Sequence, residues 1–342
     1  MISLDRTFKL LVVIALILCG LYFGQAFLAP IVLATLFAIV IMPISNWLEK
    51  FKMHRLLSSL IALLLLMIVV LTVGYYCFDQ MKELTKDMPD LEDSLINRMN
   101  QMAGYLPEAV RPGSITGFED FKVLIPEDMS WLRQLFGNFL TATGEALTIL
   151  FLIPVYIFFI LFYRKRVFDF IAAIDKSSNI ELAAITSQSQ GVVQNYLSGM
   201  GLVILIIAFM ASLGLWIMDI PYALLLGIIS AILTIIPYIG TLVGALIPIM
   251  LALVLKDSLW YAVGVAVMFT AIQLLENNFI TPIVVGRSVN INPLAAIVIL
   301  IFAGQIWGFI GLLIAIPLAG MLEIFLENVP EAHHWAKLIR NE

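Results

Sequence analysis

The chain has 342 residues, of which 62% are hydrophobic and 13% charged, and its formal net charge is −5. Soluble globular proteins are about 45–50% apolar, so this composition excludes that class and indicates a polytopic membrane protein. The positive charges are spread thinly, which excludes the basic face that nucleic-acid binding requires. Cys19 and Cys77 lie in or next to apolar runs without further ligands at metal-binding spacing, so neither a disulfide framework nor a metal site is expected.

The amino-terminal part of the chain predicts three transmembrane helices. Residues 10–48 are nearly free of charge over almost twice the ~20 residues that cross a ~30 Å hydrocarbon layer. Because Pro30 interrupts this run, we predict two crossings that turn near residues 28–30, with Pro43 kinking the second. Residues 56–78 form the third crossing. No small-residue cleavage pattern follows the first run, so we interpret it as a retained anchor and not as a signal peptide.

The next segment, residues 79–141, is polar and is expected to form a small external helical cap. Its apolar residues recur at three- and four-residue spacing: Met81, Leu84, Met88, Leu91, Leu95 and Met102. This spacing predicts an amphipathic helix that restarts at Pro89, and a second helix is predicted from Pro126. The stripe fits packing against that second helix or a contact between subunits, and the sequence leaves both open.

A fourth crossing in residues 142–163 is followed by a polar segment, residues 164–200, which keeps enough apolar positions for a helix along the membrane face. We interpret this segment as an interfacial connector that leads to a fifth crossing from Gly201. Lys and Arg in short loops are held on the cytoplasmic side. If the crossings alternate, one side receives Arg6, Lys9, Lys50, Lys52, Arg55, Arg164, Lys165, Arg166 and Lys176. Both termini are therefore expected in the cytoplasm.

The carboxy-terminal third contains two long charge-free stretches, residues 220–255 and 288–322, each interrupted by helix-breaking residues. As one straight helix the first stretch would be about 54 Å long, so it must fold back within a ~30 Å layer. Whether each stretch is re-entrant or crosses twice stays open. Irregular backbone in a membrane survives only where protein or a water-filled cavity satisfies it. We therefore predict two opposed hairpin tips that line a substrate pathway: Pro237, Tyr238, Gly240, Thr241, Gly304, Gln305 and Gly308.

Prolines and glycines in such stretches also fit a simpler role in close helix packing. We favour packing for the isolated glycines Gly227, Gly244, Gly264 and Gly320. We favour the pathway at the two breaks because hydrogen-bonding side chains accompany them. Three further positions are expected to act as kinks or hinges: Pro43, Gly311 and Pro317.

A polar island, residues 276–293, follows a crossing at residues 258–275 and separates the two stretches. Polar groups within apolar runs are costly and mark pathways. Gln273 and Glu276 are three residues apart and share a helix face with a neighbouring asparagine. Glu276 either binds a proton or cation or pairs with Arg287 to fix the loop, and both alternatives stay open. The island residues expected to matter are Gln273, Glu276, Asn277, Pro282, Gly286, Arg287 and Pro293.

Several short motifs occur in a fixed order around this island: Ile236-Pro237-Tyr238-Ile239-Gly240, Gly244 to Pro248, Glu276-Asn277, Thr281-Pro282, Gly286-Arg287, Asn292-Pro293, Ala303-Gly304, Gly308, Gly311 and Ala315-Ile316-Pro317-Leu318-Ala319. Together they resemble the autoinducer-2 exporter family of bacterial multi-pass permeases, over nearly the whole chain. The resemblance implies an inner-membrane transporter that is homo-oligomeric, with a pentamer as one alternative, and whose two hairpins belong to the moving transport unit. It also implies export of autoinducer-2, a small polar signalling molecule, or efflux of sodium or lithium against protons.

We therefore expect an all-α polytopic membrane protein with about six full transmembrane helices, two broken hairpins and a small external helical insert. The predicted domains are the first three crossings (1–78), the external insert (79–141), the fourth crossing (142–163), the connector (164–200), a transport core (201–329) and a cytoplasmic tail (330–342).

The expected function is a secondary carrier that exports a small polar solute across the bacterial inner membrane. A sodium or lithium/proton antiporter is the alternative, with Glu276 as its main candidate carboxylate, and a channel or scaffold is less favoured. Zinc-hydrolase, nucleotide-binding and Ser–His motifs are not found, so no enzyme activity and no cofactor are expected. The expected partners are a small polar solute or monovalent cation, the lipid bilayer and further copies of this chain.

Overall fold

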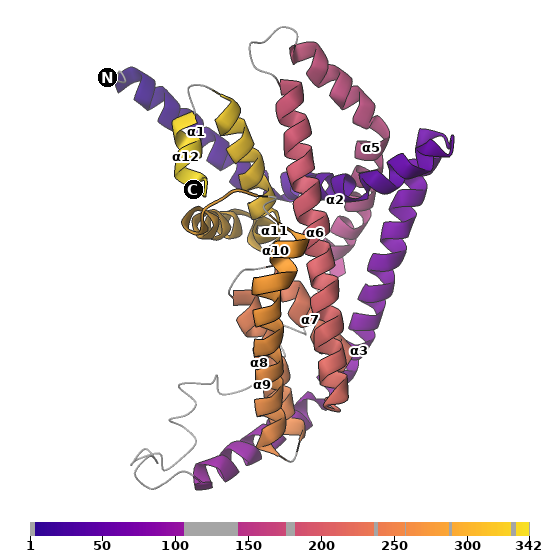
Figure 1. Ribbon diagram of the computed structural model, residues 1–342, viewed down its shortest axis with the longest axis vertical. Helices are drawn as coiled ribbons and strands as arrows, with labels where there is room; N and C mark the ends of the chain where they lie inside the picture. Colours follow the sequence, from indigo (N-terminus) through magenta and orange to yellow (C-terminus); the bar gives the residue numbers. More distant parts are fainter. Residues whose placement is uncertain are drawn as a thin grey trace. The chain divides into compact units, whose positions relative to one another are not determined.

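The structure is a computed structural model that describes residues 4–105, 143–175, 182–235, 239–256, 258–286, 289–329 and 333–341. Almost all of these residues are helical (Figure 1). Within these ranges the extended backbone is limited to an isolated bridge between Ile291 and Arg340. The prediction of an all-α polytopic membrane protein is confirmed.

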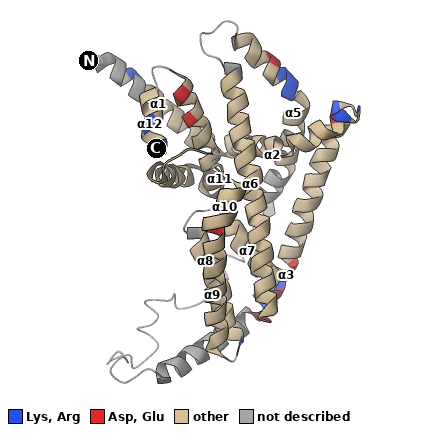
Figure 2. Cartoon of the chain, viewed as in Figure 1, with Lys and Arg blue, Asp and Glu red and all other residues tan. Residues whose placement is uncertain are grey.

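Five helical segments in the described ranges are long and apolar enough to cross a membrane: Gln25–Lys50, Arg55–Asp87, Ala184–Ile217, Leu259–Val284 and Ile310–Asn328. Four of them coincide with predicted crossings, and the fifth is the second half of the second interrupted stretch. Shorter apolar helices cover Ala223–Leu233, Gly240–Leu255 and Pro293–Gly308. Figure 2 shows long uncharged stretches along the helices, with the charges mostly near helix ends.

The turn between the first two helices lies at Gly24, and the predicted position near residues 28–30 is wrong. Helix α1 covers Leu4–Phe23 and α2 covers Gln25–Lys50, with Pro30 and Pro43 both inside α2. Glycine costs a helix about 1 kcal/mol relative to alanine, whereas Pro30 removes a single backbone hydrogen bond inside α2 and the flanking turns continue the helix. The chain therefore bends at the glycine and accommodates the proline.

Helix α3 (Arg55–Tyr105) joins the third crossing to the amphipathic segment in one continuous helix. The helix runs through Pro89, so the predicted restart there is wrong. A proline removes one backbone hydrogen bond and bends a helix without ending it when the flanking turns hold. Met81 and Leu84 of the apolar stripe are buried, as packing requires. The side chains of the rest of the stripe, and the helix predicted from Pro126, lie outside the described part.

Helix α5 covers Thr143–Asp175, and α6 covers Leu182–Ile217. The sequence predicted a separate connector helix before Gly201, whereas α6 passes through this position without a break. The first half of α6 contains the apolar positions of the predicted connector, and one of these, Val193, is fully buried. The connector is thus the beginning of the helix that carries the fifth crossing.

The chain divides into two compact units. Unit 1 comprises the described parts of Met1–Val69, Leu147–Gly201 and Pro282–Glu342, and unit 2 comprises those of Val70–Ala146 and Leu202–Thr281. The core of unit 1 includes a cluster of buried residues from α2, α3 and α5: Ala34, Ala38, Ile41, Met42, Ala62, Leu63, Ile157 and Leu161. Each unit contains one of the interrupted stretches, so the predicted transport core contributes to both.

Candidate functional site

The first interrupted stretch forms a helical hairpin in unit 2. Its arms are α7 (Ala223–Leu233) and α8 (Ile239–Leu255), which pack against each other (Figure 1). The prediction that this stretch folds back is confirmed. Pro237 and Tyr238, at the predicted tip, lie outside the described residues, and the partly buried Thr241 follows in the first turn of α8.

Close backbone contacts hold the two arms together. A Cβ atom at Gly240 would lie 1.6 Å from the carbonyl oxygen of Leu233, so only glycine fits beside the tip. Further from the tip, Ser230 Oγ donates a hydrogen bond to the Gly244 carbonyl oxygen at 2.5 Å. A Cβ atom at Gly227 would lie 2.1 Å from Ser212 Oγ of α6. The role in close helix packing that was expected of Gly227 and Gly244 is confirmed. Gly240, which was predicted to line the pathway, also makes such a close packing contact.

The two feet of this hairpin are joined by an ion pair. Lys256 Nζ donates to Asp219 Oδ2 at 2.7 Å. This hydrogen bond and the positive charge of Lys256 lower the pKa of the exposed Asp219 carboxyl below its ordinary value. Helix α7 has 11 residues and is about 17 Å long, which is too short to cross a ~30 Å hydrocarbon layer by itself.

The second interrupted stretch also forms a hairpin, within α11 (Pro293–Asn328) of unit 1. The helix is broken at Trp307 and at Gly308, whose φ of 57° and ψ of −135° are readily adopted only by glycine. A Cβ atom at Gly311 would lie 1.9 Å from the Ala303 carbonyl oxygen, whereas residues eight apart in a straight helix are separated by about 12 Å. The chain therefore folds back at the predicted break.

Trp307 anchors this second tip, a role that the sequence analysis missed. Its indole Nε1 donates to the Leu21 carbonyl oxygen of α1 at 2.9 Å. Its side chain is 7% exposed and belongs to a buried cluster with Ala29, Leu36, Val193 and Ile314. A tryptophan inside an apolar run needs an acceptor for its N–H, and this need was the available signal. Gln305, two residues earlier, is exposed.

Three further predicted positions in unit 1 lie at the start of a helix, after a helix and inside a helix arm. Pro293 is the first residue of α11, which is capped by Asn292 Oδ1 accepting from Ala295 N at 2.8 Å. Gly286 has a φ of 59° and follows the short helix α10 (Thr281–Val284). Pro317 is buried inside the second arm of α11.

The polar island begins with a π-helical turn, η1 (Glu276–Ile280), at the end of α9 (Leu259–Leu275). Such turns often occur at functional sites. Glu276 is 9% exposed, and its Oε2 accepts from Gln273 Nε2 at 2.7 Å. Gln273 Nε2 also donates to Asn277 Oδ1 at 3.1 Å, and Thr281 Oγ1 donates to Glu276 Oε1 at 3.4 Å. The predicted proximity of Gln273, Glu276 and Asn277 is confirmed.

The structure thus holds both oxygens of Glu276 with neutral donors. Arg287, the alternative partner from the sequence analysis, lies outside the described residues. Pro282 is exposed on α10. The island therefore presents a nearly buried carboxylate, an amide and a hydroxyl in one cluster, which suits hydrogen bonding to a polar ligand or a cation.

A second polar cluster, between α2, α3 and α5 of unit 1, was not predicted. Arg164 is 8% exposed and donates to Glu49 Oε1 at 2.5 Å and to Ser45 Oγ at 3.1 Å. Ser58 Oγ also donates to Glu49 Oε1, at 3.1 Å. The sequence analysis treated Arg164 only as a loop charge, because its partner is 115 residues away in the chain.

The carboxy-terminal helix α12 (His333–Ile339) is tied to the foot of α11. Asn292 N donates to the Ile339 carbonyl oxygen at 2.9 Å, and Arg340 Nη1 pairs with Glu327 Oε1 at 2.5 Å. The foot of the second hairpin is therefore held by the tail of the chain.

Comparison with known proteins assigns the chain to a family. The family model described as AI-2E family transporter matches residues 11–331. The chain belongs to this family. A putative transport protein of Bacillus subtilis, YueF, is 28% identical over 322 residues, which cover 88% of this chain and 83% of YueF.

Two relatives from Escherichia coli also match most of the chain. The AI-2 transport protein TqsA is 24% identical over 329 residues, covering 95% of this chain and 93% of TqsA. The putative permease PerM is 23% identical over 326 residues, covering 91% of this chain and 90% of PerM. Membership in the AI-2E family, together with several apolar helices of membrane-spanning length, makes this chain a multi-pass bacterial membrane transporter.

Proposed function

We propose that this AI-2E family member is a secondary carrier that exports a small polar solute, of the autoinducer-2 type, across the bacterial inner membrane. The observation that carries the proposal is the pair of helical hairpins, one formed by α7 and α8 and the other by the two arms of α11 on either side of the break at Trp307 and Gly308. Broken helices in carriers offer free backbone groups to a substrate near the middle of the membrane. The printed name of the Escherichia coli relative TqsA supports the cargo class.

The short arm of the first hairpin supports a re-entrant arrangement. Asp219 and Lys256 bring both feet to one level, and α7 reaches only about 17 Å from there. With the feet at the membrane surface, the end of α7 at Leu233 would lie at about half the depth of a ~30 Å layer. Tyr238 and Thr241 would contribute to the pathway there, and Gln305 would contribute from the second tip.

Glu276 supports both the proposed solute and the alternative cation. Neutral donors on Gln273 and Thr281 satisfy its oxygens, which suits a fixed acceptor for a polar solute. A nearly buried carboxylate at the end of an apolar helix is also what a sodium or lithium/proton antiporter needs. We favour the solute, because Glu276 is already hydrogen-bonded on both oxygens.

Proteoliposome transport separates the two functions. Autoinducer-2, sodium and lithium are offered in turn, with and without a pH gradient. We expect saturable flux and counterflow of autoinducer-2, reduced in Glu276→Gln at unchanged membrane insertion and normal in the nearby exposed variant Asn278→Ala. Sodium or lithium flux that requires the pH gradient, without autoinducer-2 flux, supports the antiporter instead. Conductance that does not saturate contradicts a carrier.

We further propose that both termini are cytoplasmic, that several copies of the chain assemble, and that the protein has transport and no enzyme activity. The family relatives with printed names of transport proteins and a permease support the last point. Cross-linking of the purified protein in membranes, followed by mass measurement, tests the assembly.

A further inference from the structure

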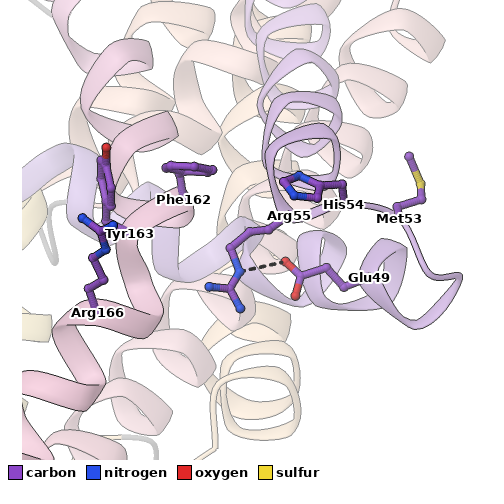
Figure 3. Close-up of a pocket in the computed structure, with 7 residues that line it drawn as sticks. All are labelled: Glu49, Met53, His54, Arg55, Phe162, Tyr163 and Arg166. Atoms are coloured by element: carbon purple, nitrogen blue, oxygen red, sulfur yellow. Dashed lines mark ion pairs between the residues drawn. The ribbon is translucent and has the colours of Figure 1, made fainter.

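A cavity of about 540 Å³ opens in unit 1 where α2 ends, α3 begins and α5 passes beside them. Figure 3 shows Arg55 at the start of α3 extending toward Glu49 of α2, with Tyr163 and Arg166 on the neighbouring α5. The volume lies within the range of about 300–1,000 Å³ that is typical of small-molecule sites. None of its lining residues belongs to the hairpin tips or to the Glu276 cluster.

The lining of the cavity has an excess of positive charge. Arg55 and Arg166 face it with a single carboxylate, Glu49, which already accepts a hydrogen bond from Arg164 behind it. Arg55 Nε lies 3.7 Å from Glu49 Oε1, so the two form an ion pair without a hydrogen bond. The same Nε atom is buried and has no hydrogen-bond partner. Arg55, which lines the cavity, therefore carries a buried N–H without a hydrogen-bond partner.

The other donors are held in place by their neighbours. The Arg166 guanidinium lies over the Tyr163 ring, 5.1 Å from its centroid, which orients it without using its N–H groups on a carboxylate. His54 Nδ1 accepts a hydrogen bond from Leu56 N at 3.4 Å, which leaves Nε2 as the nitrogen that can donate to a ligand. The amino-terminal end of α3 at Arg55 adds the positive end of a helix dipole.

We propose that this cavity binds the phosphate group of an anionic phospholipid. Guanidinium groups match phosphate oxygens with paired hydrogen bonds, and the side chains of Arg55 and Arg166 both line this cavity. The cavity lies at the level where charge gives way to apolar sequence, because α3 is uncharged from Leu56 to Phe78 and α5 is uncharged from Ala146 to Tyr163. Lipid phosphates lie at this boundary of a membrane. The exposed side chains of Leu56, Leu57 and Leu60 on α3 offer an apolar surface to the acyl chains.

Binding of the full-length protein to phosphatidylglycerol tests the proposal. Detergent-purified protein is titrated with phosphatidylglycerol, with phosphatidylcholine and with inorganic phosphate, and bound molecules are counted by native mass spectrometry. We expect phosphatidylglycerol to be retained in preference to phosphatidylcholine, and inorganic phosphate not to displace it. Displacement by millimolar phosphate would identify a soluble phosphate compound as the ligand and overturn the lipid assignment. Equal retention of both lipids would overturn the site.

Charge variants locate the binding. Arg55→Gln and Arg166→Gln should each weaken phosphatidylglycerol binding about fivefold, which corresponds to the ~1 kcal/mol that one basic residue contributes at an anionic membrane surface. Lys50→Gln and Lys52→Gln remove the same charge from exposed residues of the same loop that do not line the cavity, and should leave binding unchanged. Arg55→Lys should retain part of the binding, which separates loss of charge from loss of fold. If all four Gln variants weaken binding equally, the attraction is diffuse and the cavity is not the site.

Discussion

Gly240 and Gly311 each bring two helix arms into backbone contact, and this contact decides how tightly a hairpin closes. Any Cβ atom at these positions would overlap a carbonyl oxygen of the opposite arm. Backbone atoms cannot rotate away as a flexible side chain can, so the arms would have to separate. The requirement for glycine here is thus steric, and it holds whatever substrate the protein carries.

Replacing Gly240 by alanine should therefore destabilise the first hairpin by about 1–3 kcal/mol, the usual cost of overpacking a tight contact. Thermal unfolding of the detergent-purified protein measures the effect. Gly201→Ala is the matched control, because no atom lies within 4 Å of a Cβ atom at Gly201 and alanine is the better helix former. Equal melting temperatures for the two variants would mean that the arms of the hairpin do not close as tightly as the structure shows.

At the scale of elements, the ion pair between the buried Arg164 and the partly exposed Glu49 ties α5 to α2. Removing one partner leaves the other charge without its ion-pair partner, and we expect each of Arg164→Met and Glu49→Gln to cost about 1–3 kcal/mol. The double variant should cost less than the sum. A double-mutant cycle from chemical unfolding measures the coupling, and Lys165→Met on the exposed side of α5 serves as control. Additive effects would show that the two side chains do not interact.

The ion pair at the feet of the first hairpin predicts a dependence on pH. Because the pKa of Asp219 in the folded protein lies below its ordinary value of 3.8, the pair stabilises the hairpin above that pH, and its contribution is lost as the pH falls through the lowered pKa. The effect should be small, since the carboxylate is exposed.

Thermal unfolding at several pH values tests this dependence. Asp219→Asn should melt slightly below the unsubstituted protein at neutral pH, and the difference should shrink as the pH falls below 3.8 and vanish below the lowered pKa of Asp219. Asp169→Asn, an exposed carboxylate on α5, should show no such difference at neutral pH. A difference for Asp219→Asn that persists unchanged in acid would assign its effect to something other than the ion pair.

At the scale of the whole molecule, the distribution of basic residues predicts the orientation in the membrane. Alkaline phosphatase is active only outside the cytoplasm, so a fusion after Glu342 should be inactive and a fusion after Tyr105 active. Green fluorescent protein at the same positions should give the opposite pattern. Active phosphatase at both positions would contradict the cytoplasmic carboxy terminus.

The sequence predicted the two folded-back stretches well because their uncharged length exceeds what a bilayer accepts, which is a local property of the chain. It misplaced the first turn, which lies at Gly24, and it predicted a break at Pro89 that does not exist, because a proline removes only one backbone hydrogen bond and a helix continues through it where the flanking turns hold. The Trp307 N–H indicated that an acceptor was needed, but its partner Leu21 is 286 residues away, so no local pattern could identify that partner.

The clasp between α12 and the start of α11 has a practical consequence for anyone who truncates or labels this protein. Arg340 pairs with Glu327 near the end of α11, and Ile339 accepts from Asn292 just before its start. A truncation or label that removes these two residues would therefore loosen both arms of the second hairpin at once.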